Sequence, residues 1–346
     1  YSGDTGIGIS AGPAVLRVTA TQALGTGTVG LDLAGNASTA RLELTGGISL
    51  ANAITFPARN NSSVGIESIS GNNTLSGSIT LGAGGSTYQI QSDAGTLTLG
   101  TSITTAITAA SGSRTVTLQG AGSGNIAGAI LDGGGTVGIL KNGPGTWTLS
   151  GFNIYNGATT VSNGTLLVNG SMSGAVTVSG GTLGGTGIVG GAVTVNSGGT
   201  LSPGASPGTM TINGNITLNG GSTNVFEVNA GGSHDLVAAG AGVAYGGVLN
   251  VVPTGTISAG QQFQLFSGAG ATNASNFASI QGSPGSGLGF NFTNGVLSVA
   301  SISGGSSTLT NMVSGGGTTL QLSWGNGWEL ERQTNSLGAG LGTNWQ

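Results

Sequence analysis

The chain has 346 residues, of which 73 are Gly, 37% are hydrophobic and only 5% are charged, with a formal net charge of −4. This composition argues against the highly charged kind of disorder, and irregular glycine spacing with only seven Pro argues against a collagen helix. Six basic residues against ten acidic ones form no basic stripe that could neutralise phosphates, so we expect no nucleic-acid partner.

Features of targeting and cross-linking are scarce in the sequence. The apolar runs end after a few residues at Ser, Thr, Asn or Gly, far short of the ~20 residues of a transmembrane helix. The lack of Cys removes disulfides, thiolate metal sites and cysteine nucleophiles together, so stability must come from packing. Because the sequence starts at Tyr1 with no signal segment before it, we expect a processed or excised piece of a longer precursor.

Short β-strands are predicted along most of the chain. Each candidate alternates an apolar residue with Thr, Ser or Asn, which is the two-residue period of a strand with one buried and one solvated face. Helical spacing of apolar residues is absent. The candidate strands, in chain order, are residues 78–81, 95–99, 115–118, 146–149, 165–168, 209–212 and 215–218.

An internal repeat separates two possible all-β architectures. Residues 175–183, Ala-Val-Thr-Val-Ser-Gly-Gly-Thr-Leu, recur as residues 192–201 with an offset of 17 to 18 residues. Their Gly-rich turns could close either the hairpins of a sandwich or the coils of a parallel solenoid. A solenoid stacks equivalent positions every ~4.8 Å, so the recurring Val-Thr-Val and Thr-Leu segments favour the solenoid.

The repeat length predicts an elongated molecule. At about 18 residues per coil, residues 1–300 would hold about 16 coils in a rod about 75 Å long. The core would be a narrow column of Val, Ile and Leu, with large rings filling the wider coils or covering an end. The rings assigned to these places are Phe56, Trp147, Phe152, Tyr155, Phe226, Phe263 and Phe266.

The composition changes after about residue 303. Trp324, Trp328 and Trp345 follow a Gly-Gly-Ser-Ser linker at residues 304–307, and Glu329, Glu331 and Arg332 lie among them. A single hairpin cannot bury such large rings. We therefore predict two regions, a β-helix over residues 1–303 and a Trp-rich β segment over residues 304–346. The three Trp rings need a partner surface, either the rod or another molecule.

One stretch of the sequence resembles a known repeat. Residues 141–161 and 164–170 contain, in order, Lys, Gly-x-Gly-Thr, Leu-Ser-Gly, Tyr-x-Gly, Thr-Thr-Val and Gly-Thr-Leu. This pattern closely resembles the autotransporter-associated β-strand repeat of bacterial secreted and surface proteins. Trp147 stands where that family usually has Leu. Residues 226–263 look like the region that commonly follows such repeats, and residues 320–345 are similar to a small β module that ends many exported proteins.

The resemblance implies a fold and a location. Members of this family form a right-handed parallel β-helix outside the bacterial cell, with roles in surface display, adhesion or matrix. The fold class predicted for this chain is accordingly all-β, a parallel β-helix with a short C-terminal β segment. An extracellular or cell-surface location is expected.

Candidate catalytic and binding residues carry little weight. Ser233, His234 and Asp235 are consecutive, and a triad needs three side chains that converge in space, so we interpret them as a polar turn. Glu329 and Glu331 could pair as glycosidase carboxylates, but neighbours on one strand more often mark a solvated face. Two G-x-G-x-x-G matches, at residues 25–30 and 185–190, precede no helix. We predict no catalytic, cofactor-binding or metal-binding residues.

Aspartates were weighed as calcium ligands because Gly-rich calcium repeats place an Asp in every turn. The aspartates here are isolated, which leaves open only a single incidental site. They are Asp4, Asp32, Asp93, Asp132 and Asp235.

Three functions are compatible with these features. The first is a non-enzymatic extracellular rod that builds a surface layer, fibre or matrix by self-association, with Trp324, Trp328 and Trp345 as the candidate joint. The alternative is an adhesin that binds glycans or cell surfaces along one face, through aromatics such as Tyr88 or Tyr155. The third, a polysaccharide-cleaving enzyme, would need clustered carboxylates or basic residues that the sequence lacks.

Overall fold

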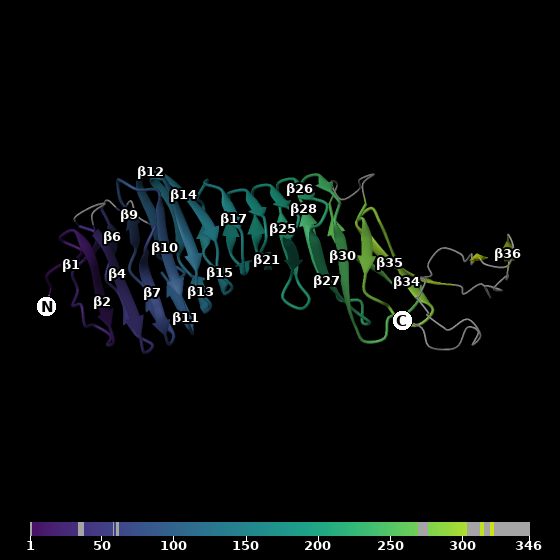
Figure 1. Ribbon diagram of the computed structural model, residues 1–346, viewed down its shortest axis with the longest axis horizontal. Helices are drawn as coiled ribbons and strands as arrows, with labels where there is room; N and C mark the ends of the chain where they lie inside the picture. The colour runs from purple at the N-terminus through teal and green to yellow at the C-terminus, as the bar shows by residue number, and fades with distance from the viewer. Residues whose placement is uncertain are drawn as a thin grey trace.

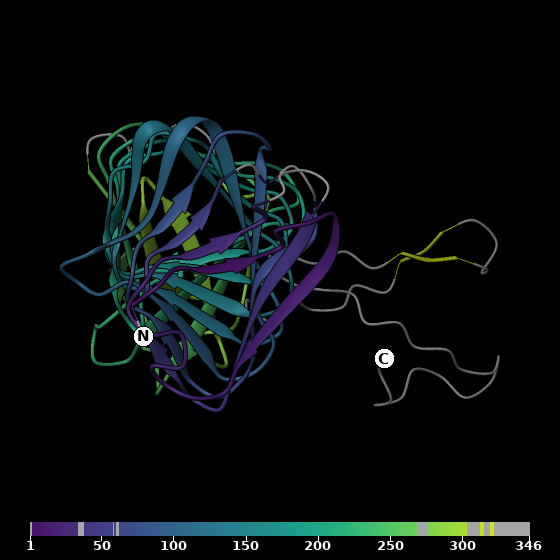
Figure 2. The same cartoon turned by 90° about the vertical axis from the view of Figure 1, so that its left-hand side faces the viewer.

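The computed structural model describes residues 2–33, 38–57, 59, 62–268, 276–302, 312–314 and 319–321. Within these residues the chain is all-β, and no helix is present that could cross a membrane. Coils follow one another along a rod, from β1 (Thr5–Ile7) at one end to β35 (Val296–Ser301) near the other (Figure 1). Figure 2 looks along the rod and shows the coils stacked around a common interior. The predicted parallel β-helix is confirmed, and the sandwich is excluded.

The first long sheet, sheet 1, takes one strand from each coil, and its neighbouring strands pair in parallel. Thr160, Thr177 and Thr194 stand in register on three successive strands, which is the stacking that the repeat predicts. In spatial order the strands are β1, β3 (Val29–Leu31), β6 (Ile54–Phe56), β9 (Ile79–Leu81), β12 (Thr105–Gln119), β14 (Ala129–Lys141), β17 (Thr159–Val161), β20 (Val176–Val178), β23 (Val193–Val195), β26 (Ile216–Leu218) and β29 (Val243–Ala244).

A branch of sheet 1 widens the coils in the first third of the chain. The 15-residue β12 pairs in parallel with β9 and also with the last strand of the branch. The branch contains β2 (Gly12–Val18), β4 (Ser38–Thr45), β7 (Val64–Ser70) and β10 (Thr87–Ser92).

Sheet 2 forms the second side of the coils and also pairs in parallel throughout. Its eleven strands are β5 (Ser49–Leu50), β8 (Asn73–Leu75), β11 (Thr96–Leu99), β13 (Ser123–Ile126), β15 (Thr146–Leu149), β18 (Thr165–Val168), β21 (Thr182–Gly185), β24 (Thr200–Pro203), β27 (Thr223–Asn229), β30 (Val248–Thr254) and β33 (Ser279–Gln281).

Sheet 3 closes the coils on their third side from residue 152 onward, again with parallel pairing. Its strands are β16 (Phe152–Asn153), β19 (Ser171–Met172), β22 (Ile188–Val189), β25 (Thr209–Ile212), β28 (Leu236–Ala239) and β32 (Phe266–Ser267).

The number of coils is smaller than the sequence predicts. Val176 pairs with Val193, 17 residues on, as expected, but Val29 pairs with Ile54, and Ile216 with Val243, at offsets of 25 and 27 residues. The extra strands of the branch account for the longer coils near the N-terminus. The eleven strands of sheet 2 give about ten turns, and ten steps of ~4.8 Å make a stack about 48 Å long in place of the expected 75 Å.

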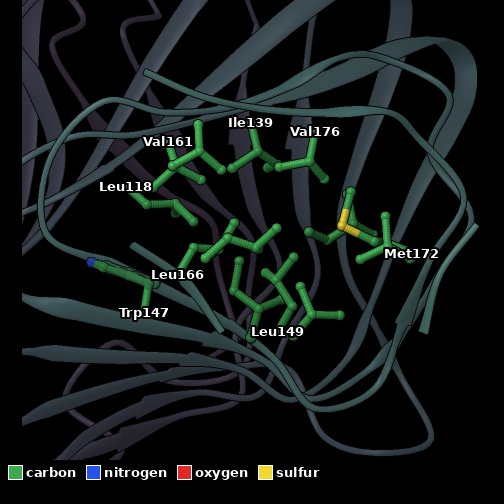
Figure 3. Close-up of a cluster of buried hydrophobic side chains, with 14 of the residues drawn as sticks. Leu118, Ile139, Trp147, Leu149, Val161, Leu166, Met172 and Val176 are labelled. Atoms are coloured by element: carbon green, nitrogen blue, oxygen red, sulfur yellow. The ribbon is translucent and has the colours of Figure 1, made fainter. Parts of the chain in front are cut away.

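Inward-facing side chains form one continuous apolar core. Figure 3 shows Trp147 and Leu166 of sheet 2 facing Leu118, Ile139 and Val161 of sheet 1, and all five are buried. Close packing of this kind holds the sheets together, since each coil can bury its apolar face only against its neighbours.

Most of the large rings assigned to the interior are buried there, and Phe152 is the exception. Its side chain is 71% exposed, while the neighbouring Asn153 points inward. The Asn153 amide accepts a hydrogen bond from Ile130 N at 3.0 Å and donates to the carbonyl oxygens of Gly151 and Ser171 at 2.9 Å each. The corner therefore uses the inward position for hydrogen bonds between coils, and the ring is turned outward.

The C-terminal end of the solenoid is covered by an antiparallel sheet of β31 (Gln262–Gln264), β35 and β34 (Leu288–Thr293). Under it, the Phe292 ring lies 5.0 Å from Tyr245 and 4.9 Å from Phe277, and Tyr245 lies 5.1 Å from Phe266, measured between ring centroids. These buried rings close the apolar core at this end.

A short β segment also occurs in the C-terminal region, as predicted. Strand β36 (Met312–Ser314) pairs antiparallel with β37 (Thr319–Gln321). Trp324, Trp328, Trp345, Glu329 and Glu331 lie outside the described residues, and the boundary at residue 303 stays a prediction.

Glycines at one corner set how closely the coils approach. A Cβ atom on Gly151 would lie 2.2 Å from the carbonyl oxygen of Gly128, and one on Gly170 would lie 2.1 Å from that of Gly151. Gly187 repeats the contact one coil on, at 2.1 Å from the Gly170 oxygen. Real Cβ atoms do not come so close to backbone, so this column requires glycine.

We therefore predict that Gly170→Ala lowers the free energy of unfolding by about 2 kcal/mol, because the added methyl must push two coils apart. The matched control is Gly242→Ala, where the new Cβ would meet only the Asn215 side chain at 3.5 Å. Urea unfolding followed by circular dichroism measures both. Equal effects of the two substitutions would contradict the proposed backbone contact.

Candidate functional site

The Ser-His-Asp sequence at residues 233–235 is built into a turn. The Nδ1 atom of His234 lies 2.8 Å from the carbonyl oxygen of Gly232, and its ring packs edge-on against Phe263. Asp235 is only 3% exposed, and its carboxylate accepts hydrogen bonds from Gly208 N and Glu227 N, at 2.9 and 2.8 Å. These contacts are structural, and they support the interpretation of a polar turn.

Burial raises the pKa of Asp235 above its ordinary value, and the nearby negative charge of Glu227 adds to the rise. The two backbone N–H groups and His234 act in the opposite direction without cancelling it. The carboxylate therefore fastens the segment before β25 to β27, where it is shielded from water.

A depression of about 470 Å³ lies on the outer side of β27 and β30, next to this turn. Glu227 and Ser206 face each other there, with the Ser206 hydroxyl donating to Glu227 Oε1 at 3.2 Å. Sequence reasoning missed both residues, because they are 21 residues apart and belong to no motif. Only the stacking of coils brings them together.

The repeat segment carries the other unusual group, the buried Lys141 at the end of β14. Its ammonium donates to the carbonyl oxygens of Gly143 and Asn163, at 2.7 and 3.0 Å, and so joins two successive coils. The side chain is completely buried, and this burial lowers its pKa to about 8.

This shift predicts a pH dependence of stability. Between about pH 8 and its ordinary pKa of 10.5, Lys141 is neutral in the folded protein and charged in the unfolded chain. The unfolded state then binds more protons, so stability rises with pH across this window. Below it the cost of keeping the charge buried is fully present.

We expect urea midpoints measured from about pH 7.5 to about pH 9.5 to rise for the wild type and to stay nearly flat for Lys141→Met. The window ends below the range in which tyrosines titrate, so they do not contribute. A rise of the same size in Lys141→Met would show that another group is responsible.

A second buried charge lies near the N-terminus. Arg59 and Asp32 are both fully buried, and a guanidinium nitrogen of Arg59 donates to the Asp32 carboxylate and to the carbonyl oxygen of Ala40. The other Asp32 oxygen accepts from Ala40 N at 2.6 Å. Burial lowers the pKa of Arg59, and the charge of Asp32 partly opposes this.

Removing one partner of a buried ion pair leaves an uncompensated charge, which costs about 3–5 kcal/mol in proteins. We expect Asp32→Asn, which suits the positive φ of 59° at this position, to lower the unfolding free energy by about 3 kcal/mol. The double substitution with Arg59→Met should recover part of the loss. A cost below about 0.5 kcal/mol for Asp32→Asn would argue against the pair.

Exposed charges form a ladder along the outer face of the branch. Burial alone would raise the pKa of Glu43, but hydrogen bonds from Arg17 and Arg41, together with their charges, lower it. Contacts at 2.8, 3.0, 3.1 and 2.7 Å link successive strands through the pairs Arg17–Glu43, Arg41–Glu67, Gln91–Glu67 and Gln119–Gln91. This ladder ties coils together, and its groups satisfy one another.

Two aromatic residues suggested as glycan contacts are in fact buried, so this prediction is wrong. Tyr88 packs against Phe56 at 5.4 Å between ring centroids, and Tyr155 shares a 2.7 Å hydrogen bond with the Thr159 hydroxyl. Both occupy inward positions of their coils. The alternating pattern does not tell which face of a short strand an aromatic residue takes when it lies at a corner.

Metal and nucleotide chemistry finds no support in the described part of the chain. There, no three His, Cys, Asp or Glu side chains gather to hold a metal ion. The two G-x-G-x-x-G segments run into β3 and β22, which are strands.

Comparison with known families confirms the resemblance for one segment. Residues 139–168 match the family model described as passenger-associated-transport-repeat. The match covers the end of β14 through β18, including Lys141 and Trp147. No curated protein matches the chain. The fold and this match together describe a β-solenoid protein that is similar, over this segment, to autotransporter passenger repeats.

Proposed function

We propose that the protein is a non-enzymatic structural rod at the bacterial surface or outside the cell. The observation that carries the proposal is the unbroken parallel stacking of coils in sheets 1 and 2. Such a stack spans distance with a single repeated unit and resists cleavage because its backbone is hydrogen-bonded throughout. The passenger-associated repeat supports a secreted or surface location.

The distribution of charge supports a structural role. In the described residues, the strongly buried charged groups Lys141, Arg59, Asp32 and Asp235 all hydrogen-bond to backbone or to each other across coils. Groups used in this way stabilise the stack and are not presented to a substrate. The outer columns consist largely of Thr, Ser, Asn and Gly, which favour a hydrated, chemically inert surface.

We further propose that the rods associate with one another. An outer strand of the solenoid, such as β2, pairs on one side only, and unpaired strand edges favour association. Trp324, Trp328 and Trp345 are the candidate joint, because large rings near the end of a chain gain most when a partner covers them.

Negative-stain electron microscopy and sedimentation velocity of the purified chain test this proposal. Wild-type protein should form rods that join into longer assemblies as the concentration rises. The triple variant Trp324→Ser, Trp328→Ser, Trp345→Ser should remain as single short rods, since the joint has lost its apolar rings. Phe152→Ser removes an exposed ring from the side of the rod and is the control that should still assemble.

Monodisperse wild-type particles at high concentration would overturn the self-association. Assembly that is lost equally in the Phe152 control would place the contact on the side of the rod and remove the Trp residues from the joint.

A further inference from the structure

The depression beside β27 and β30 has the geometry of a binding site and is independent of the assembly proposed above. The two strands pair in parallel over seven residues, with Glu227 opposite Val252 and Asn229 opposite Thr254. They form its floor. Residues 204–208 form one wall, and the turn at residues 230–234 lies at its other side.

The walls are held by hydrogen bonds that do not involve a ligand. The Asp235 carboxylate binds Gly208 N and Glu227 N, and Leu236 N donates to the Gly208 carbonyl oxygen at 3.0 Å. Gly204 adopts a φ of 92°, and a Cβ atom there would lie 2.1 Å from Asp235 Oδ1. The wall therefore packs directly onto the buried carboxylate, and the depression is formed in advance.

The groups that face the depression are acceptors and hydroxyls. Glu227 supplies the only charge in its lining, with the Ser206 hydroxyl bound to one carboxylate oxygen. The Asn229 amide donates to the Thr254 hydroxyl at 3.3 Å, and Ser233 lies at the rim. Val252, 38% exposed, adds a small apolar surface between them.

The charge of this region limits what can bind. The basic residues within the described chain all lie at or before residue 141, so the depression offers carboxylate and no cation. A phosphate or carboxylate ligand would be repelled. A carboxylate that accepts two hydroxyl groups, neighbouring hydroxyl and amide side chains, and an apolar patch fit an uncharged sugar, which has hydroxyls at its edge and C–H groups on its face.

We propose that this depression binds a hexose unit of a neutral glycan. The Glu227 carboxylate accepts hydrogen bonds from adjacent sugar hydroxyls, Ser206 and Asn229 bind further hydroxyls, and Val252 packs against the C–H face. The volume of about 470 Å³ falls within the range of small-ligand sites. A rod with such a site could attach to a polysaccharide while its ends remain available for assembly.

The probes are cello-, malto- and manno-oligosaccharides of four units, titrated into the full chain by calorimetry and saturation-transfer NMR. At least one should bind with a millimolar or tighter Kd. Glu227→Ala should weaken that binding at least tenfold, and Val252→Asp, which changes an exposed side chain, should do the same. Asp93→Ala removes a carboxylate outside the depression and should leave the affinity unchanged.

Circular dichroism melts identify variants that fail to fold, and Val252→Asp keeps the test valid if Glu227→Ala is one of them. Absence of binding by all three oligosaccharides at millimolar concentration would overturn the proposal, as would binding that both substitutions leave intact. The triple Trp variant should bind as the wild type does, so failure of assembly and failure of glycan binding are separately observed.

Discussion

Hydrogen bonding of each coil onto the next, in register, is the constraint on which the rest of the structure depends. Because equivalent positions lie directly over one another, a residue that suits one coil must also fit against its copies. Thr columns, inward Val and Leu columns and the corner glycines from Gly128 to Gly187 all follow from this requirement. Coil length can vary between 17 and 27 residues without breaking the register, since the added residues enter as extra strands or loops.

Polar groups inside the stack serve the same end. Asn153 and Lys141 each bond to backbone in neighbouring coils, and Asp235 fastens a loop to the strand beside it. A chain with 5% charged residues places several of these few charges where water is excluded. Each buried group has hydrogen-bond partners that offset part of its desolvation. The same bonds prepare the wall of the depression at Glu227, so stability and the proposed binding site share one carboxylate.

The sequence was sufficient for the fold class because its repeat corresponds to real stacking: Val176 lies over Val193 as the echo of residues 175–183 predicts. The repeat segment was identified for a related reason, since its glycines and Thr positions are fixed by the corners. Coil number was overestimated because the branch carries no such echo. The orientations of Phe152, Tyr88 and Tyr155 depend on which corner residue makes hydrogen bonds inward, and the pairing of Ser206 with Glu227 depends on contacts between coils, which leave no local pattern.

The narrow middle of the solenoid has a mechanical consequence. Each coil is attached only to the two beside it, so a rod held at its ends and pulled could peel from one end without a single cooperative rupture. A coil of 17 residues would release about 60 Å of extended chain, and one of 27 residues about 90 Å. Extension would thus proceed in unequal steps whose lengths follow the coil circumference, and the rod could absorb a sudden load gradually while its remaining coils stay folded.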